Sequence, residues 1–147
     1  MRNKNAKRQH SVAPFTGESN VPAPADFLPL AKFITEITDG SDDMTDEFAD
    51  YAGDGTVQTD IVGIQESWDV SGTFDITDPA QALIAGMKRK VGAERKVWHK
   101  IVDSNGTEEI LGVATALSIV AGSGAAEDHE EFSCTLQFDQ RPTVSAV

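Results

Sequence analysis

Alternation of apolar and polar residues is the main pattern along this chain, and it predicts a β-rich protein. In residues 131–139, four apolar side chains alternate with polar ones, which is typical of a strand with one buried face. A second run begins at Ile64, where apolar residues take the even positions and polar residues the odd ones. The polar set is Gln65, Ser67, Asp69, Ser71, Thr73 and Asp75.

Further strands are predicted at residues 30–38, 94–102 and 108–120, and the region 56–77 forms a strand pair or one bent strand. In this region the apolar residues change from odd to even positions near Gly63, which predicts a β-bulge there. Asn105-Gly106 is a strong hairpin signal between the strands at 94–102 and 108–120. Within 108–120 the larger apolar residues are expected to share the buried face. They are Leu111, Val113, Leu117 and Ile119.

One helix is predicted, at about residues 79–91. Asp78 is a good N-cap residue, Pro79 suits the first turn, and Gly92 is a plausible stop. Because strands precede and follow this single helix, the fold class is mainly β. We expect two packed, mostly antiparallel sheets, as a β-sandwich or a partial barrel, with the helix on one side and a long early loop.

Two segments lack strand periodicity. Residues 1–24 are polar and contain several prolines, so we interpret them as an extended or disordered N-terminal arm. Residues 39–56 read as a long acidic loop, in which the helical spacing of Met44, Phe48 and Tyr51 allows one helical turn. The expected organisation is therefore an arm at 1–24, a β domain at 25–143 and a short tail at 144–147.

Charge is strongly segregated along the 147 residues, and the net charge is −12. Between Phe33 and Met87 there are thirteen acidic residues and no basic ones, whereas six of the bases lie at 88–100. Such an acidic chain argues against a protein that grips nucleic acid through phosphates. Separated blocks of opposite sign suit self-association, although a merely solvated surface would show the same pattern.

The sequence offers little for catalysis or metal binding. His10, His99 and His129 are far apart, with no ligand spacing, and His99 reads as a surface or interface residue. The acidic loop fails the EF-hand pattern, and neither a phosphate-binding loop nor a hydrolase motif is present. Cys134 alternates with apolar residues and reads as a buried small hydrophobe. We therefore expect no enzyme activity, no metal and no cofactor.

Nothing in the sequence predicts export or a membrane span. The basic N-terminus is not followed by an apolar stretch, so it is not a secretory signal. The most apolar stretch, 110–121, is too short and too interrupted to cross a bilayer. A soluble protein made in a cytoplasm is expected.

The order of these elements resembles that of bacteriophage tail tube proteins, and the resemblance covers about residues 25–143. It is carried by Glu-Ser-Trp-Asp-Val-Ser-Gly at 66–72, Asp-Pro-Ala-Gln at 78–81, the hairpin at 98–106, Gly-Val-Ala-Thr at 112–115, Glu-Phe-Ser-Cys-Thr-Leu at 131–136 and Pro142. The final turn at 139–142 departs from the family pattern, because it lacks a glycine.

The resemblance implies a subunit that forms hexameric rings, stacked head to tail into a tube through which DNA passes. It implies no cofactor, a location in the virion tail after assembly in a bacterial cytoplasm, and contacts with tape-measure, tail terminator and distal tail proteins. The polar set from Gln65 to Asp75 is the candidate lumen lining. The candidate inter-ring contacts are Arg2, Lys4, Lys7, Arg8, Asp42, Asp43, Met44, Asp46, Phe48 and Tyr51.

Two other interpretations remain open from the sequence. A head–tail connector or terminator protein would form one ring and would not elongate. A non-viral β-sandwich binding module would stay monomeric and would carry a pocket.

Overall fold

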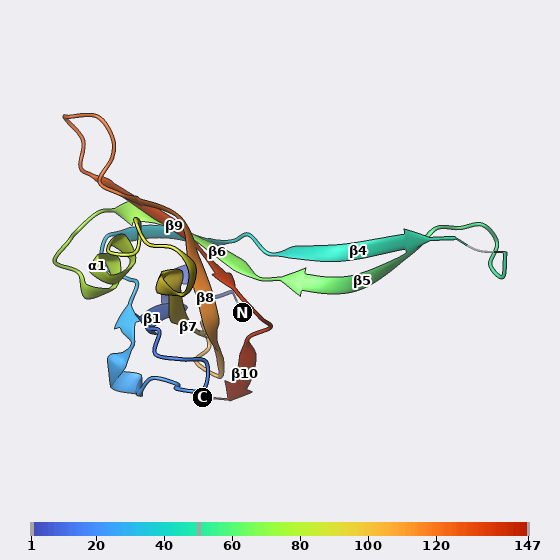
Figure 1. Ribbon diagram of the computed structural model, residues 1–147. Helices are drawn as coiled ribbons and strands as arrows, with labels where there is room; N and C mark the ends of the chain where they lie inside the picture. The colour runs from blue at the N-terminus through green and yellow to red at the C-terminus, as the bar shows by residue number, and fades with distance from the viewer. Residues whose placement is uncertain (1, 50, 147) are drawn as a thin grey trace.

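The computed structural model describes residues 2–49 and 51–146, which form one curled antiparallel sheet and a separate two-stranded ribbon (Figure 1). Seven strands of the eight-stranded sheet have the order β2-β1-β7-β8-β9-β6-β3. The eighth strand, β10, pairs with β8 outside this order. The strands of this sheet are β1 (Gln9–Pro14), β2 (Leu28–Pro29), β3 (Ile34–Asp39), β6 (Ser67–Thr73), β7 (Lys96–Val102), β8 (Glu108–Ala121), β9 (Glu131–Phe138) and β10 (Thr143–Ala146). The ribbon consists of β4 (Asp42–Phe48) and β5 (Gln58–Gln65).

The predicted fold class is confirmed: the chain is mainly antiparallel β with one α-helix. Of the two forms that the sequence left open, the structure has the partial barrel, because the main sheet curls around the core (Figure 1). The strands β3, β7, β8 and β9 lie within two or three residues of their predicted positions, apart from a later start of β3. The bulge near Gly63 is also present, since Met44 pairs with Gly63 and Thr45 with Ile61.

The interpretation of residues 1–24 as a segment without regular structure is wrong for Gln9–Pro14. This segment is β1, which pairs with β7 along its whole length and buries Val12 and Ala13 completely. Asn3, further upstream, donates a 2.6 Å hydrogen bond to Asn105 in the β7–β8 turn. With only three buried side chains among six residues, β1 is too short to show a clear period in the sequence.

The long loop predicted at 39–56 is wrong for Asp42–Phe48, because these seven residues form strand β4. Met44 and Phe48 therefore belong to a strand and not to a helical turn. Every residue of β4 is exposed, so the strand needs no apolar face. Its sequence therefore shows no alternation of apolar and polar residues. The predicted C-terminal tail is likewise mostly strand, since β10 pairs with the start of β8.

The helix α1 (Pro79–Ala85) begins as predicted but ends early. The Asp78 side chain caps it by accepting a hydrogen bond from the Gln81 backbone N–H. After Ala85 the chain continues in tighter turns, in which Met87 N–H donates to Ile84 O and Lys88 N–H to Ala85 O. Gly86 is the C-cap residue, and glycine has a low helix propensity, which the apolar stripe alone could not indicate.

The core lies between the inner face of the curled sheet and α1. It contains, among others, Val12, Val70, Ile84, Val97, Ile101, Phe132, Leu136 and Phe138. On β8 the fully buried residues are Ala114 and Ala116, so the expectation that Leu111, Val113 and Leu117 face the core is wrong. Small residues are required there because the Phe138 ring lies against β8, only 2.9 Å from where a Cβ on Gly112 would sit.

Gln81 on α1 ties the helix to the end of β6 and to the segment before β3. Its side chain is fully buried; Oε1 accepts from Asp75 N–H at 2.7 Å, and Nε2 donates to Thr73 O at 3.1 Å and Lys32 O at 3.2 Å. Each of these backbone groups would lose its partner without the amide.

Replacing Gln81 with leucine is therefore expected to lower the free energy of unfolding by about 2–4 kcal/mol, since buried polar groups are left unpaired. Urea unfolding measures this change. The exposed Gln140, replaced by leucine in the same way, should change the value by less than about 0.5 kcal/mol. Equal effects of the two substitutions would contradict the role given to Gln81.

Among the described residues, no helix is both long enough and apolar enough to span a membrane.

Candidate assembly surfaces

The β4–β5 ribbon projects from the body of the protein and, within residues 2–49 and 51–146, pairs with no other strand (Figure 1). Residues opposite each other in an antiparallel pair share a face, so the register sorts its side chains. What we call the acidic face carries Asp42, Met44, Asp46, Phe48 and Asp60. What we call the mixed face carries Asp43, Thr45, Glu47, Thr59 and Ile61. Most of the predicted inter-ring contacts in this region thus lie together on the acidic face.

An isolated ribbon of this kind has low stability in water. Two-stranded hairpins are marginally stable alone, and this one exposes several large apolar side chains. Ile61 is 64% exposed and Val62 67% exposed. On the acidic face Asp46 lies directly opposite Asp60, an unfavourable like-charge pair. Both features indicate a surface that is covered by another protein surface.

The predicted lumen residues divide between several places. Ser67, Asp69, Ser71 and Thr73 lie on β6, on the face of the sheet opposite the core, beside the hydroxyl and amide groups of β9. We call this surface the polar face; its β9 members are Ser133, Thr135 and Gln137. Thr135 Oγ1 donates a 2.7 Å hydrogen bond to Asp69 Oδ1 across the two strands.

The other two predicted lumen residues lie elsewhere. Gln65 ends the ribbon strand β5, and Asp75 follows β6 in the turn before α1. Ser67, although on the polar face, is only 9% exposed, and Gly40 and Ser41 lie against it: Gly40 N–H donates to Ser67 O at 2.9 Å, and Ser67 N–H donates to Ser41 Oγ at 3.3 Å. The continuous polar face therefore centres on Asp69, Ser71 and their β9 neighbours.

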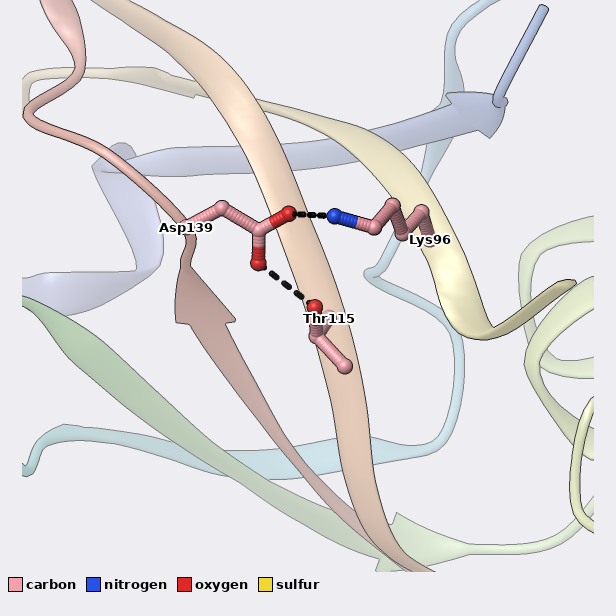
Figure 2. A network of polar contacts seen from close by, with 3 residues as sticks. All are labelled: Lys96, Thr115 and Asp139. Atoms are coloured by element: carbon pink, nitrogen blue, oxygen red, sulfur yellow. Dashed lines mark hydrogen bonds and ion pairs between the residues drawn. The ribbon is translucent and has the colours of Figure 1, made fainter. Parts of the chain in front are cut away.

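A polar network continues this face onto β8 and β7 (Figure 2). The centre of this network is Asp139, just after β9. Thr115 Oγ1 donates to Asp139 Oδ1 at 2.6 Å, and the Lys96 ammonium forms an ion pair with the other carboxylate oxygen. Side chains thus join β7, β8 and the segment just after β9 at the polar surface of the sheet.

The basic residues of the N-terminus do not meet the ribbon within one chain. Arg2, Lys4 and Lys7 are exposed, and the Arg8 guanidinium packs over the Trp68 ring, 5.5 Å from its centroid. In the described part of the chain, the two ion pairs are those of Lys96 and Lys100, and neither involves the N-terminal bases. A contact between these bases and the ribbon would have to be made between copies.

The second basic block, at 88–100, is partly used inside the fold. Lys96 pairs with Asp139, and the Lys100 ammonium lies 3.6 Å from a Glu109 carboxylate oxygen. The Arg95 guanidinium donates to the carbonyl oxygens of Lys88, Lys90 and Ala116 at 2.6, 2.8 and 3.1 Å. The exposed remainder of the block is Lys88, Arg89 and Lys90, just past the end of α1.

A buried histidine pair is the feature that the sequence did not predict. His99, expected at the surface, is fully buried, and its Nε2 lies 3.2 Å from His10 Nδ1 on the neighbouring strand. Trp68 packs edge-on against His10, and Phe138 stacks on His99. The pairing was hidden because residues 9–14 gave no strand signal, so nothing placed His10 beside β7.

The strongly shifted pKa values belong to groups inside the core. Burial lowers the pKa of His10 to about 4 and that of His99 to about 3, helped by the positive charge of Arg8 near His10. Burial raises the pKa of the Cys134 thiol to about 12, which confirms its prediction as a buried residue. In the described ranges, no group of three or more His, Cys, Asp or Glu side chains is arranged to hold a metal ion. The surfaces available to partners are therefore the ribbon, the polar face and the two basic clusters.

Comparison with solved structures places this architecture among proteins of tails and tubes. A chain from the tail of an empty gene transfer agent (GTA) particle, solved with C6 symmetry, matches with a TM-score of 0.73 at 11% identity over 99% of both chains. A chain from a native GTA virion matches with a TM-score of 0.69 at 9% identity, again over 99% of both. No protein-family model and no curated protein matches the sequence.

Two further structures show the same fold with lower similarity. One belongs to the sheath–tube complex of an extracellular contractile injection system, with a TM-score of 0.57 at 14% identity over 99% of this chain and 93% of that one. The other belongs to the tube-terminating cap of the anti-feeding prophage, with a TM-score of 0.56 at 13% identity over 100% and 93%. The chain thus has the tail-tube fold.

Proposed function

We propose that this protein is the structural subunit of a phage-type tail tube, assembled as hexameric rings that stack head to tail. The observation that carries the proposal is the unpartnered ribbon, together with a tail-tube fold that extends over 99% of the chain. Open sheet edges, such as the outer edge of β3, invite pairing with another chain, and closure of a ring removes them. One type of heterologous contact per subunit closes a ring, and a second stacks the rings into a tube.

In this assembly the polar face lines the bore. Asp69, Ser71 and Thr135 offer hydroxyl and carboxylate groups but few cations, since Lys96 is already paired with Asp139. Carboxylates on the wall repel phosphates, so DNA would pass without adhering. DNA is thus a transient occupant of the channel and not a bound ligand.

The stacking contact pairs the N-terminal bases of one ring with the acidic face of the ribbon in the next. Arg2, Lys4 and Lys7 supply exposed positive charge, and Arg8 lies beside them. On the acidic face, Asp42, Asp46 and Asp60 supply the opposite charge, whereas Asp43 lies on the mixed face. Met44, Phe48 and Tyr51 are exposed apolar anchors for the same contact.

Tape-measure, tail terminator and distal tail proteins are the further partners of such a tube, which would be part of a virion tail assembled in a bacterial cytoplasm. A terminator ring is the second candidate function, favoured by the similarity to a tube-terminating cap.

Negative-stain electron microscopy of the purified chain separates these functions. Long tubes support the tail tube, discrete rings support the terminator, and monomers at high concentration support neither.

The stacking contact is tested by reversing the exposed N-terminal charges with Arg2→Glu, Lys4→Glu and Lys7→Glu. Rings without long tubes are expected, because only the contact between rings loses its charge complementarity. Arg2→Lys, Lys4→Arg and Lys7→Arg form the matched control, which should still give tubes. Truncation is unsuitable because it would approach β1 and its buried residues. Normal tubes from the charge-reversed chain would remove this contact.

A further inference from the structure

The segment after α1 is a basic surface held in a fixed shape. We call residues Lys88–Val91 the basic turn; its three cationic side chains are exposed, and Val91 is 81% exposed. The Arg95 guanidinium bonds the carbonyl oxygens of Lys88 and Lys90, at 2.6 and 2.8 Å. This clamp fixes the backbone of the basic turn, so a partner that binds it pays little entropy for ordering the main chain.

The basic turn follows α1 in the body of the protein, whereas the ribbon projects away from that body (Figure 1). Two complementary surfaces at different places on one subunit form a heterologous contact when copies stand next to each other, and such contacts close rings.

The mixed face of the ribbon carries negative charges that complement the cations of the basic turn. Asp43 and Glu47 provide two carboxylates on one strand, and Ile61 provides an apolar side chain on the other. On this face Thr45 lies opposite Ile61, Glu47 opposite Thr59, and Asp43 opposite the exposed Ile64. The basic turn pairs three cations with one apolar residue, which matches this arrangement in both charge and polarity.

We propose that the mixed face of one copy's ribbon docks on the basic turn of a second copy in the same ring. Asp43 and Glu47 pair with Lys88, Arg89 and Lys90, and Ile61 packs against Val91. This contact rests on the proposed tube function and specifies the lateral interface, whereas the acidic face and the N-terminal bases serve stacking. A nucleic acid on the basic turn is the competing occupant, disfavoured by the net charge of −12.

The test reverses the basic turn and then exchanges its partner. Lys88→Glu, Arg89→Glu and Lys90→Glu together are expected to weaken ring formation by at least tenfold in sedimentation velocity, with unchanged circular dichroism. Adding Asp43→Lys and Glu47→Lys to the same chain should restore rings, because every contact then has its charges exchanged. The charge-preserving set Lys88→Arg, Arg89→Lys and Lys90→Arg is the control and should assemble like the wild type.

The outcomes separate this contact from the tube function. If the wild-type chain forms no rings at all, the proposed function fails. If the wild type and the charge-reversed chain assemble equally, the function stands and this contact is overturned. Loss of rings without rescue by the exchange also overturns it, because the basic turn then faces something other than the ribbon. Unchanged assembly with weaker retention of DNA fragments would assign the basic turn to nucleic acid instead.

Discussion

Replacing Gly72 with alanine is expected to lower the free energy of unfolding by about 3 kcal/mol or more. A Cβ at position 72 would lie 2.1 Å from the Phe33 carbonyl oxygen and 2.8 Å from the Ile34 Cα. Both atoms are backbone, so neither can rotate away. Phe33 is also held in the left-handed region, at φ 63°, while its carbonyl accepts a 2.8 Å hydrogen bond from Thr73 N–H. The methyl group can be accommodated only if β3 separates from β6.

Gly63 is the matched control, because it also lies in a strand but has room for a methyl group. The nearest atom to its added Cβ is the Met44 sulfur at 3.5 Å, an ordinary contact with a flexible side chain. Gly63→Ala should therefore change stability by less than about 1 kcal/mol in urea unfolding. If Gly72→Ala proved as mild as Gly63→Ala, the close approach of β3 to β6 would be wrong.

Acid is expected to destabilise the subunit from about pH 6.5 downwards, because two buried histidines stay neutral in the fold. His10 and His99 are neutral in the fold, with pKa values lowered to about 4 and about 3, whereas the unfolded chain takes up protons near pH 6.5. The unfolded state therefore binds more protons as the pH falls below 6.5, and stability is lost from there down towards pH 4 and 3. At roughly 1 kcal/mol per pH unit for each histidine, unfolding at pH 5 should be several kcal/mol easier than at pH 7.

Urea unfolding at pH 7, 6 and 5 measures this loss, and His129→Gln is the control, because His129 is exposed. That variant should keep the wild-type pH dependence, whereas His10→Gln with His99→Gln should flatten it. NMR of the native wild type gives an independent reading that does not depend on the variants folding. Imidazole signals of His10 and His99 that titrate near pH 6.5 would contradict the buried pair.

The parts of the fold with one buried and one solvated face could be predicted from the sequence. Residues 131–139 alternate without interruption, and β9 occupies almost the same range. The start of α1 was also predictable, because Asp78 and Pro79 act through local backbone chemistry that needs no tertiary information. Asn105-Gly106 is similar: Gly106 adopts φ 72° in the β7–β8 turn.

The misses share a physical cause, which is burial that the local pattern does not reflect. The ribbon strand β4 buries nothing within its own chain, so hydrophobic periodicity could not reveal it. On β8 the core side is formed by Ala114 and Ala116, because Phe138 fills the space above them, and larger residues nearby gave the wrong face. The His10–His99 pair depends on the pairing of two strands 89 residues apart in sequence.

The candidate assembly residues were predicted from charge, strand alternation and family resemblance, and the structure shows which of them share a surface. Asp42, Met44, Asp46 and Phe48 prove to share one face of a ribbon. The opposite face and the basic turn could not be recognised without the β4–β5 register and without knowing which bases of the 88–100 block are already paired. Charge segregation in the sequence thus indicated self-association, but not which surfaces meet.

A reconstruction by cryo-electron microscopy of the particles formed by the purified chain tests the account most directly. The expected result is six copies per ring, with Asp69, Ser71 and Thr135 exposed to a central channel and each ribbon lying on another copy. A ring whose polar face points outwards, or a chain that remains monomeric with its ribbon uncovered at high concentration, would contradict it.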